Sequence, residues 1–216
     1  MRIKRCLALL LGAAAALSLC ACAGAGPDMS VQPAQLTQEE SNLVKLLDVG
    51  MEDFHIYDFT VSDKVQSIQI NAYELEDGAW SMVVGGGGHA FTDPKGRLAL
   101  RFGKLTEGMS VALQGESSSG GVSHHTEPEE GGGPMSFATS TLTRSMPVVY
   151  EEEIPLVIQV ATTQSEIRTF DVEYFSRPEE YEKFNYEHVY AVTVRFSEKP
   201  LSELSGSAPP ETTNVD

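Results

Sequence analysis

The chain has 216 residues, of which 41% are hydrophobic and 8% aromatic, and its formal net charge at pH 7 is −16. So acidic a chain is poorly suited to nucleic acid or to electrostatic docking on anionic lipid, because both attract positive charge. All three cysteines lie within the first 22 residues, so the rest of the chain has no disulfide and must fold on its hydrophobic core alone.

The N-terminus has the pattern of a secretory signal peptide. Arg2, Lys4 and Arg5 form a positive region, and an apolar run over residues 7–21 follows it. The run is shorter than the roughly 20 apolar residues of a transmembrane helix, which favours a cleaved signal over a retained span. Loss of residues 1–21 removes three positive charges from the total of −16 and leaves a mature chain of charge −19.

The end of this run, Leu19-Cys20-Ala21-Cys22, resembles the lipobox of bacterial lipoproteins. The resemblance implies a signal peptide of residues 1–21 and a diacylglyceryl thioether on Cys22. Acyl chains such as palmitate would then hold the protein on the outer face of the bacterial cell membrane, since two or more chains anchor stably. Cys20 is the rival lipidation site, although Leu19 precedes it where a small residue is expected. An ordinary secretory leader without lipid is the other alternative.

Two segments of different composition follow Cys22 and precede the first predicted strand. Residues 22–38 are rich in small residues, Pro and Gln without apolar periodicity, which predicts a flexible tether. Residues 38–50 place leucines and a valine at helical spacing, with Thr37 as the cap and Gly50 as the stop, so a short amphipathic helix is predicted. One domain over residues 39–201 is expected, a length that can bury a proper core.

From residue 54 the apolar period becomes two, the period of a half-buried strand. The segments expected to be strands are 54–61, 65–76, 80–84, 97–102, 109–113, 137–144, 147–150, 154–162, 167–175 and 188–196. The second and third should form a hairpin around Asp77-Gly78, and the glycine run 85–88 should end the third. Residues 177–184 suit one or two helical turns. The pattern predicts an all-β antiparallel sandwich of about 9–10 short strands, with a barrel as the alternative.

Two segments lack apolar periodicity altogether. Residues 116–134 are dominated by Gly, Ser and Glu, which predicts a long mobile loop inserted between strands. Residues 202–216 are rich in Pro, Ser and Thr and are predicted to be a disordered tail.

The sequence carries no motif that points to a cofactor or to catalysis. It lacks a Gly-x-Ser-x-Gly elbow and a His-Glu-x-x-His pair, and no Gly-Lys-Ser/Thr follows the glycine run to form a phosphate loop. His124, His125 and Glu127 are weak candidates for divalent metal ligands, because their side chains suit Zn²⁺ and lie close together. A solvated acidic loop is the simpler interpretation, so no metal or cofactor is expected.

Aromatic residues offer the other weak candidate site. Trp80, Tyr181 and Tyr186 are the candidates for a sugar-binding surface, and the two tyrosines are the ones expected to be exposed. Core packing is the simpler interpretation, since most aromatics of this chain fall at inward positions of alternating strands.

These patterns predict a non-catalytic, membrane-anchored lipoprotein that binds a protein or a glycan at the cell surface. In its lipobox, polar tether and acidic β domain the chain resembles the small surface lipoproteins of Gram-positive anaerobes. A carbohydrate- or solute-binding module is the first alternative, and a hydrolase with an unrecognised carboxylate site is the second. Nucleic acid is not an expected partner, and the sequence does not indicate an oligomeric state.

Overall fold

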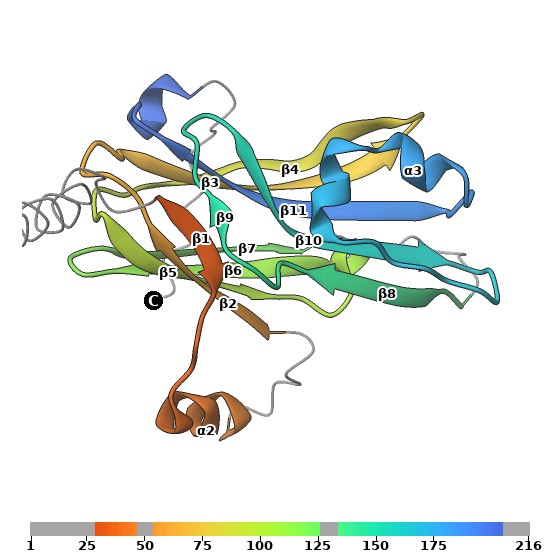
Figure 1. Cartoon of the computed structure of the whole chain (residues 1–216), viewed down its shortest axis with the longest axis horizontal. Coiled ribbons are helices and arrows are strands. Elements are labelled where there is room, and N and C mark those ends of the chain that lie inside the picture. The colour runs from red at the N-terminus through yellow and green to blue at the C-terminus, as the bar shows by residue number, and fades with distance from the viewer. Residues whose placement is uncertain (1–28, 47–53, 126–133, 205–216) are drawn as a thin grey trace, which may run out of the picture.

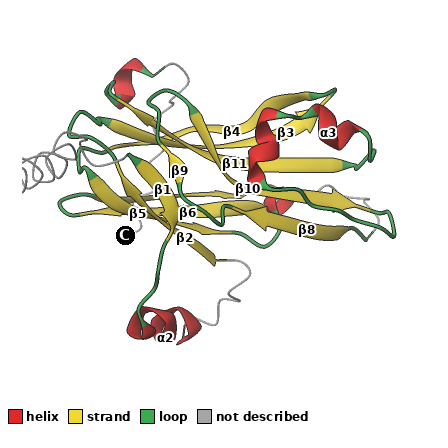
Figure 2. Cartoon of the chain, in the orientation of Figure 1, coloured by secondary structure: helices red, strands yellow, loops and turns green. Residues whose placement is uncertain are grey.

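The computed structural model describes residues 29–46, 54–125 and 134–204 (Figure 1). Eleven strands in that part of the chain form two antiparallel sheets, which confirms the predicted β-sandwich with one strand more than expected. Strands fill both layers, and the helical segments lie at the margins (Figure 2).

Sheet A has six strands in the order β7-β6-β5-β2-β1-β9. Their bounds are β1 (Ser30–Pro33), β2 (Phe54–Thr60), β5 (Lys95–Arg101), β6 (Gly108–Gly115), β7 (Ser119–His125) and β9 (Met146–Pro147). Sheet B has five strands in the order β4-β3-β11-β10-β8. Their bounds are β3 (Ser67–Glu76), β4 (Ala79–Ala90), β8 (Ser136–Thr141), β10 (Glu153–Thr162) and β11 (His188–Ser197).

Five short helical segments complete the described chain. The α-helices are α2 (Gln38–Leu46) and α3 (Glu179–Glu182), and the 3-10 turns are η1 (Leu105–Glu107), η2 (Val172–Ser176) and η3 (Leu201–Glu203). Both α-helices fall within the segments predicted to be helical.

The core lies between the sheets and follows the predicted alternation. Ile68 and Ile70 of β3 lie opposite Phe196 and Val194 of β11, and all four are buried. Such a side chain contributes about 1.5–3 kcal/mol when it leaves water. Strand β10 is apolar on both faces and is buried from Ile154 onward, because η2 covers the face that points away from the core. The expectation of a central strand there is confirmed.

The hairpin between β3 and β4 forms as predicted. Asp77 and Gly78 turn the chain with φ angles of 49° and 76°. Two consecutive positive φ angles match the twist of the flanking strands, and aspartate followed by glycine suits such a turn. The glycine run does not end β4, however. Gly87 and Gly88 pair with Ile70 and Gln69, because the ladder uses backbone groups that glycine retains.

The predictions of a tether and of a mobile loop are each wrong over part of their length. Residues 30–33 form β1, whose Val31 is only 1% exposed, so the predicted tether of residues 22–38 is wrong there. Residues 119–125 form β7, where Val122 lies opposite Val111 of β6 and packs on the core. The predicted loop of residues 116–134 is therefore wrong over β7, and residues 126–133 lie outside the described part.

Two predictions near the C-terminus also need correction. Residues 167–175 do not pair as a strand; Asp171 caps η2 by accepting a hydrogen bond from the Glu173 amide, and the aromatic residues of the segment pack on one another. The predicted tail of residues 202–216 begins too early, because η3 and the buried Leu204 still belong to the fold. Residues 205–216 lie outside the described part.

Candidate binding groove

A groove of about 410 Å³ lies beside α2 where sheet A meets the end of β8. Three segments line it: the β1–α2 connection with Val44 of α2, residues 54–57 of β2, and residues 141–143. Volumes of about 300–1,000 Å³ are usual for sites that bind small molecules. We call this site the α2 groove.

A capping box fixes the start of α2. The amide of Glu40 donates to Oγ1 of Thr37 at 3.2 Å, and the amide of Thr37 donates to Oε2 of Glu40 at 2.7 Å. The two bonds satisfy donors that every helix start leaves free. The predicted cap at Thr37 is thereby confirmed. A helix of nine residues is marginal by itself, so α2 depends on such local bonds and on contacts with the sheet.

Arg97 ties α2 to sheet A. Its Nη1 lies 2.6 Å from Oε1 of Glu40, and its Nε lies 2.8 Å from Oδ1 of Asp58 on β2. The hydrogen bond from the Thr37 amide, with that from Arg97, lowers the pKa of Glu40 to about 2. The Glu40 carboxylate therefore stays charged through the neutral range, and one arginine holds the wall of the groove in place.

Helix α2 contributes one side chain to the groove and exposes two other apolar side chains. Val44 is the buried residue of the helix, whereas Leu43 and Leu46 are 63% and 79% exposed.

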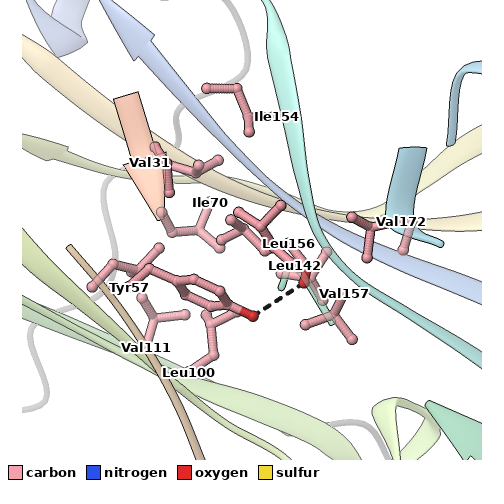
Figure 3. Close-up of a cluster of buried hydrophobic side chains, with 14 of the residues drawn as sticks. Val31, Tyr57, Ile70, Leu100, Val111, Leu142, Ile154, Leu156, Val157 and Val172 are labelled. Atoms are coloured by element: carbon pink, nitrogen blue, oxygen red, sulfur yellow. Dashed lines mark hydrogen bonds between the residues drawn. The ribbon is translucent and has the colours of Figure 1, made fainter. Parts of the chain in front are cut away.

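His55 and Tyr57 form the inner end of the groove. The His55 ring lies 5.5 Å from that of Phe102, centroid to centroid. The Tyr57 hydroxyl donates to the carbonyl of Leu156 in the opposite sheet at 3.1 Å (Figure 3). Burial raises the pKa of Tyr57, so its hydroxyl stays protonated and keeps this bond.

Among the described residues that line the groove, none is Asp, Glu, Lys, Arg or Cys. Apolar walls with a few polar groups, here a histidine, a tyrosine and two threonines, suit the binding of a small ligand. Sequence reasoning did not single out this site, because three segments distant in the chain contribute to it and none carries a motif.

The structure describes two of the three candidate metal ligands, His124 and His125. His124 and His125 are neighbours in β7, so their side chains leave opposite faces of the strand. Within the described ranges, no three His, Cys, Asp or Glu residues are grouped closely enough to hold a metal ion. Glu127, Cys20 and Cys22 lie outside those ranges.

The candidate aromatic residues form a packed layer over sheet B. Tyr181 is only 1% exposed, so the expectation that it faces solvent is wrong; it meets the rings of Trp80 and Phe170 edge-on. Trp80 donates from Nε1 to the carbonyl of Phe175 at 2.7 Å. The half-buried Tyr186 stacks on Phe184. These rings bury one another instead of lining up as a flat platform for a sugar.

The fold and the groove define the class of this protein as an all-β sandwich domain with a groove of about 410 Å³. No family model, no curated protein and no solved structure matches this chain. None of the helices in the described residues has the length and apolar character needed to cross a membrane.

Proposed function

We propose that this chain is an exported lipoprotein, anchored through Cys22, whose sandwich binds a small apolar ligand in the α2 groove. The groove carries the binding proposal, because its volume of about 410 Å³ and its neutral lining suit such a ligand. The anchoring proposal rests on the leader and its final cysteine.

The groove favours ligands that bury apolar surface. Burial stabilises a complex by about 25 cal/mol per Å², and Val44 and Leu142 offer aliphatic walls for it. The two threonines supply a few polar atoms that can orient a ligand. An acyl chain or an aromatic solute has the required chemistry.

The binding proposal is tested with the mature chain, prepared without detergent, and the apolar fluorophore N-phenyl-1-naphthylamine. Ala34→Trp places a large ring in the groove and should weaken binding of the fluorophore about tenfold or more, which is 1.4 kcal/mol. Ala112→Trp is the matched control, because Ala112 is exposed on β6 away from the groove. Equal binding by both variants would exclude the groove as the site.

The anchoring proposal has its own matched pair of variants. Cys22→Ser should move the protein from the detergent phase to the aqueous phase in phase-partition experiments, whereas Cys20→Ser should leave it in the detergent phase. Intact mass of the native protein should equal residues 22–216 plus the lipid. The opposite behaviour of the two variants would identify Cys20 as the modified residue, and no change in either would exclude a cysteine-linked lipid.

A further inference from the structure

Strand β8 forms one end of sheet B, and among the described strands β10 alone pairs with it (Figure 1). Each sheet of the sandwich has two end strands, and β8 is the one of these four whose residues also line the α2 groove. The edge of an end strand presents backbone N–H and C=O groups to any extended chain that comes beside it. An open strand edge and an apolar groove therefore adjoin each other at β8.

The ladder with β10 determines which backbone groups of β8 face the open edge. The two strands pair without a register shift. Just beyond β8 and in the same register, the amide of Leu142 donates to the carbonyl of Leu156 at 2.8 Å. Successive residues of a strand direct their backbone groups to opposite sides. The N–H and C=O groups of Thr141 and Thr139 therefore point away from β10, toward the open edge.

The side chains of these two threonines point toward sheet A. Gln159, opposite Thr139 on β10, donates to the carbonyl of Gly103 between β5 and β6 and to the Thr139 hydroxyl, each at 3.0 Å. Opposite residues of an antiparallel pair share a face, and so do residues two apart in one strand, here Thr139 and Thr141. Gln159 is 1% exposed, yet Thr139 is exposed. The inner face of β8 is therefore accessible at this edge.

The α2 groove lies on the same inner side of β8. Thr141 lines it together with the two residues that follow, and residues 54–57 of β2 line it from sheet A. A residue placed beside Thr141 in an added strand would share the face of Thr141. Its side chain would therefore enter the groove.

The edge of β8 lacks the features that usually prevent the addition of a strand. Natural edge strands are blunted by lysine, by proline, by bulges or by very short length. Residues 136–143 contain no charged residue and no proline. Strand β8 pairs regularly over 6 residues, whereas β9 has 2 residues and two register shifts interrupt β4. The edge of β8 is thus suited to accept a further strand.

We propose that the partner of this site is an extended peptide, which pairs with β8 and places an apolar side chain in the α2 groove. The inference rests on the proposed function, because it takes the α2 groove as the binding site and names the ligand. A free apolar molecule fills the groove alone, whereas a peptide also bonds to the backbone of Thr139 and Thr141. Main-chain bonds to a sheet edge, with pockets for alternate side chains, are an established mode of peptide recognition. The net charge of −16 favours a basic peptide.

The test uses the mature chain without detergent and four synthetic peptides of the form Ac-Lys-Thr-Thr-X-Thr-Thr-Lys-NH₂, in which X is leucine, isoleucine, phenylalanine or tryptophan. Binding is measured by displacement of N-phenyl-1-naphthylamine and by NMR shifts of the Thr139 and Thr141 amides. At least one peptide should displace the fluorophore and shift both amide signals in a saturable manner.

Methylation of the peptide amides tests the pairing with β8 directly. Two versions of the tightest-binding peptide carry N-methyl groups on alternate residues, one version for each set of amides. Only one set can face β8, so one version should bind at least about tenfold more weakly and the other as the parent peptide does. Equal binding by the two versions would exclude strand addition.

Variants of the protein test the edge and the groove separately. Thr141→Pro removes an N–H that faces the open edge and keeps the ladder with β10, because an edge strand tolerates proline on its solvent side. It should bind the peptide about tenfold more weakly. Thr141→Val keeps the amide and is the matched control, which should bind as the native chain does. Ala34→Trp fills the groove and should weaken binding of both the peptide and the fluorophore.

Three results would overturn the inference and leave the proposed function standing. If the fluorophore binds in the groove and no peptide displaces it, the groove takes a free apolar molecule. If Thr141→Pro and Thr141→Val bind the peptide equally, the peptide does not pair with β8. If Ala34→Trp weakens fluorophore binding alone, the peptide binds elsewhere. Equal fluorophore binding by Ala34→Trp and the native chain would overturn the proposed function itself, and the inference with it.

Discussion

The hydroxyl of Tyr57 in sheet A donates to the carbonyl of Leu156 in sheet B at 3.1 Å and so bonds the two layers directly (Figure 3). The same carbonyl accepts the backbone amide of Leu142 at 2.8 Å. The Leu156 carbonyl therefore accepts two hydrogen bonds. The tyrosine hydroxyl adds to a bond that the backbone already supplies.

Tyr57→Phe should destabilise the protein only mildly. The variant keeps the buried ring, and the carbonyl of Leu156 retains the Leu142 amide, so the expected cost is about 0.5–1.5 kcal/mol in urea unfolding. Leu156→Ala, which leaves a cavity at a fully buried position, should cost about 2–5 kcal/mol. A Tyr57→Phe cost as large as that of Leu156→Ala would show that the Leu142 amide does not compensate.

Arg97→Ala should loosen α2 without unfolding the sandwich. The variant removes both the Glu40 and the Asp58 contact, and a partly exposed ion pair of this kind contributes about 0–1 kcal/mol to global stability. Amide exchange in α2 should accelerate while that in β10 and β11 stays unchanged. Arg101→Ala, exposed on the same strand, is the control and should leave α2 exchange as it is. Equal acceleration of α2 exchange by both variants would show that the contacts of Arg97 with Glu40 and Asp58 do not hold α2 on sheet A.

Stability should fall with acid below about pH 4.5. Hydrogen bonds from Thr37, Ser117 and Thr162 lead the causes that lower the pKa of Glu40, Asp93 and Glu187, respectively, to about 2 each. A carboxylate with a lowered folded-state pKa stabilises fully above its unfolded pKa, here 3.8 to 4.5, and loses that contribution as the pH falls toward 2.

Urea unfolding at a series of pH values measures this loss. Glu187→Gln should flatten the acid side of the profile, because its side chain no longer takes up a proton on unfolding. Glu179→Gln is the control, since Glu179 is an exposed glutamate outside these clusters. If the acid side of the profile were equally steep in Glu187→Gln and in the native chain, the Glu187 carboxylate would not contribute to the loss of stability in acid.

Asp93→Ala should free the turn between β6 and β7. Asp93 accepts four hydrogen bonds, from the amide and the hydroxyl of both Ser117 and Ser118. Without them the two serine amides should exchange faster with solvent, and Tm should fall. Asp93→Asn keeps one acceptor oxygen and should give an intermediate result. Unchanged exchange in Asp93→Ala would mean that the strands alone hold the turn.

Alternation predicted the buried strands of this fold well. The two-faced apolar run of β10 indicated a central strand, and the Asp77-Gly78 pair indicated the hairpin of β3 and β4. Prediction failed at β7 and at the glycine run of β4, which lie at sheet edges. Their ladders form through backbone groups, which the composition of a glycine- and serine-rich segment does not reveal.

The groove and the edge of β8 were less accessible to sequence reasoning. The α2 groove forms from three segments that only the fold brings together. Residues 137–144 were predicted to be a strand, but the position of β8 at the end of sheet B depends on how all the strands pair. The sequence predicts an exposed Tyr181 because this residue precedes the last strand and does not lie on an alternating strand. Aromatic neighbours from β4 and from residues before η2 enclose it instead.

Strand β1 has a mechanical consequence for an anchored protein. Ser30 pairs with Thr60 of β2 on one side and with Pro147 of β9 on the other. The seven peptide steps from Cys22 to Met29 span at most about 25 Å, so a lipid on Cys22 would keep the sandwich that near the bilayer. Any force between membrane and domain enters lengthwise through β1. To pull β1 out along its axis, the force must break its ladders with β2 and β9 at the same time. The strand therefore resists such a force more than it would if its hydrogen bonds broke one after another.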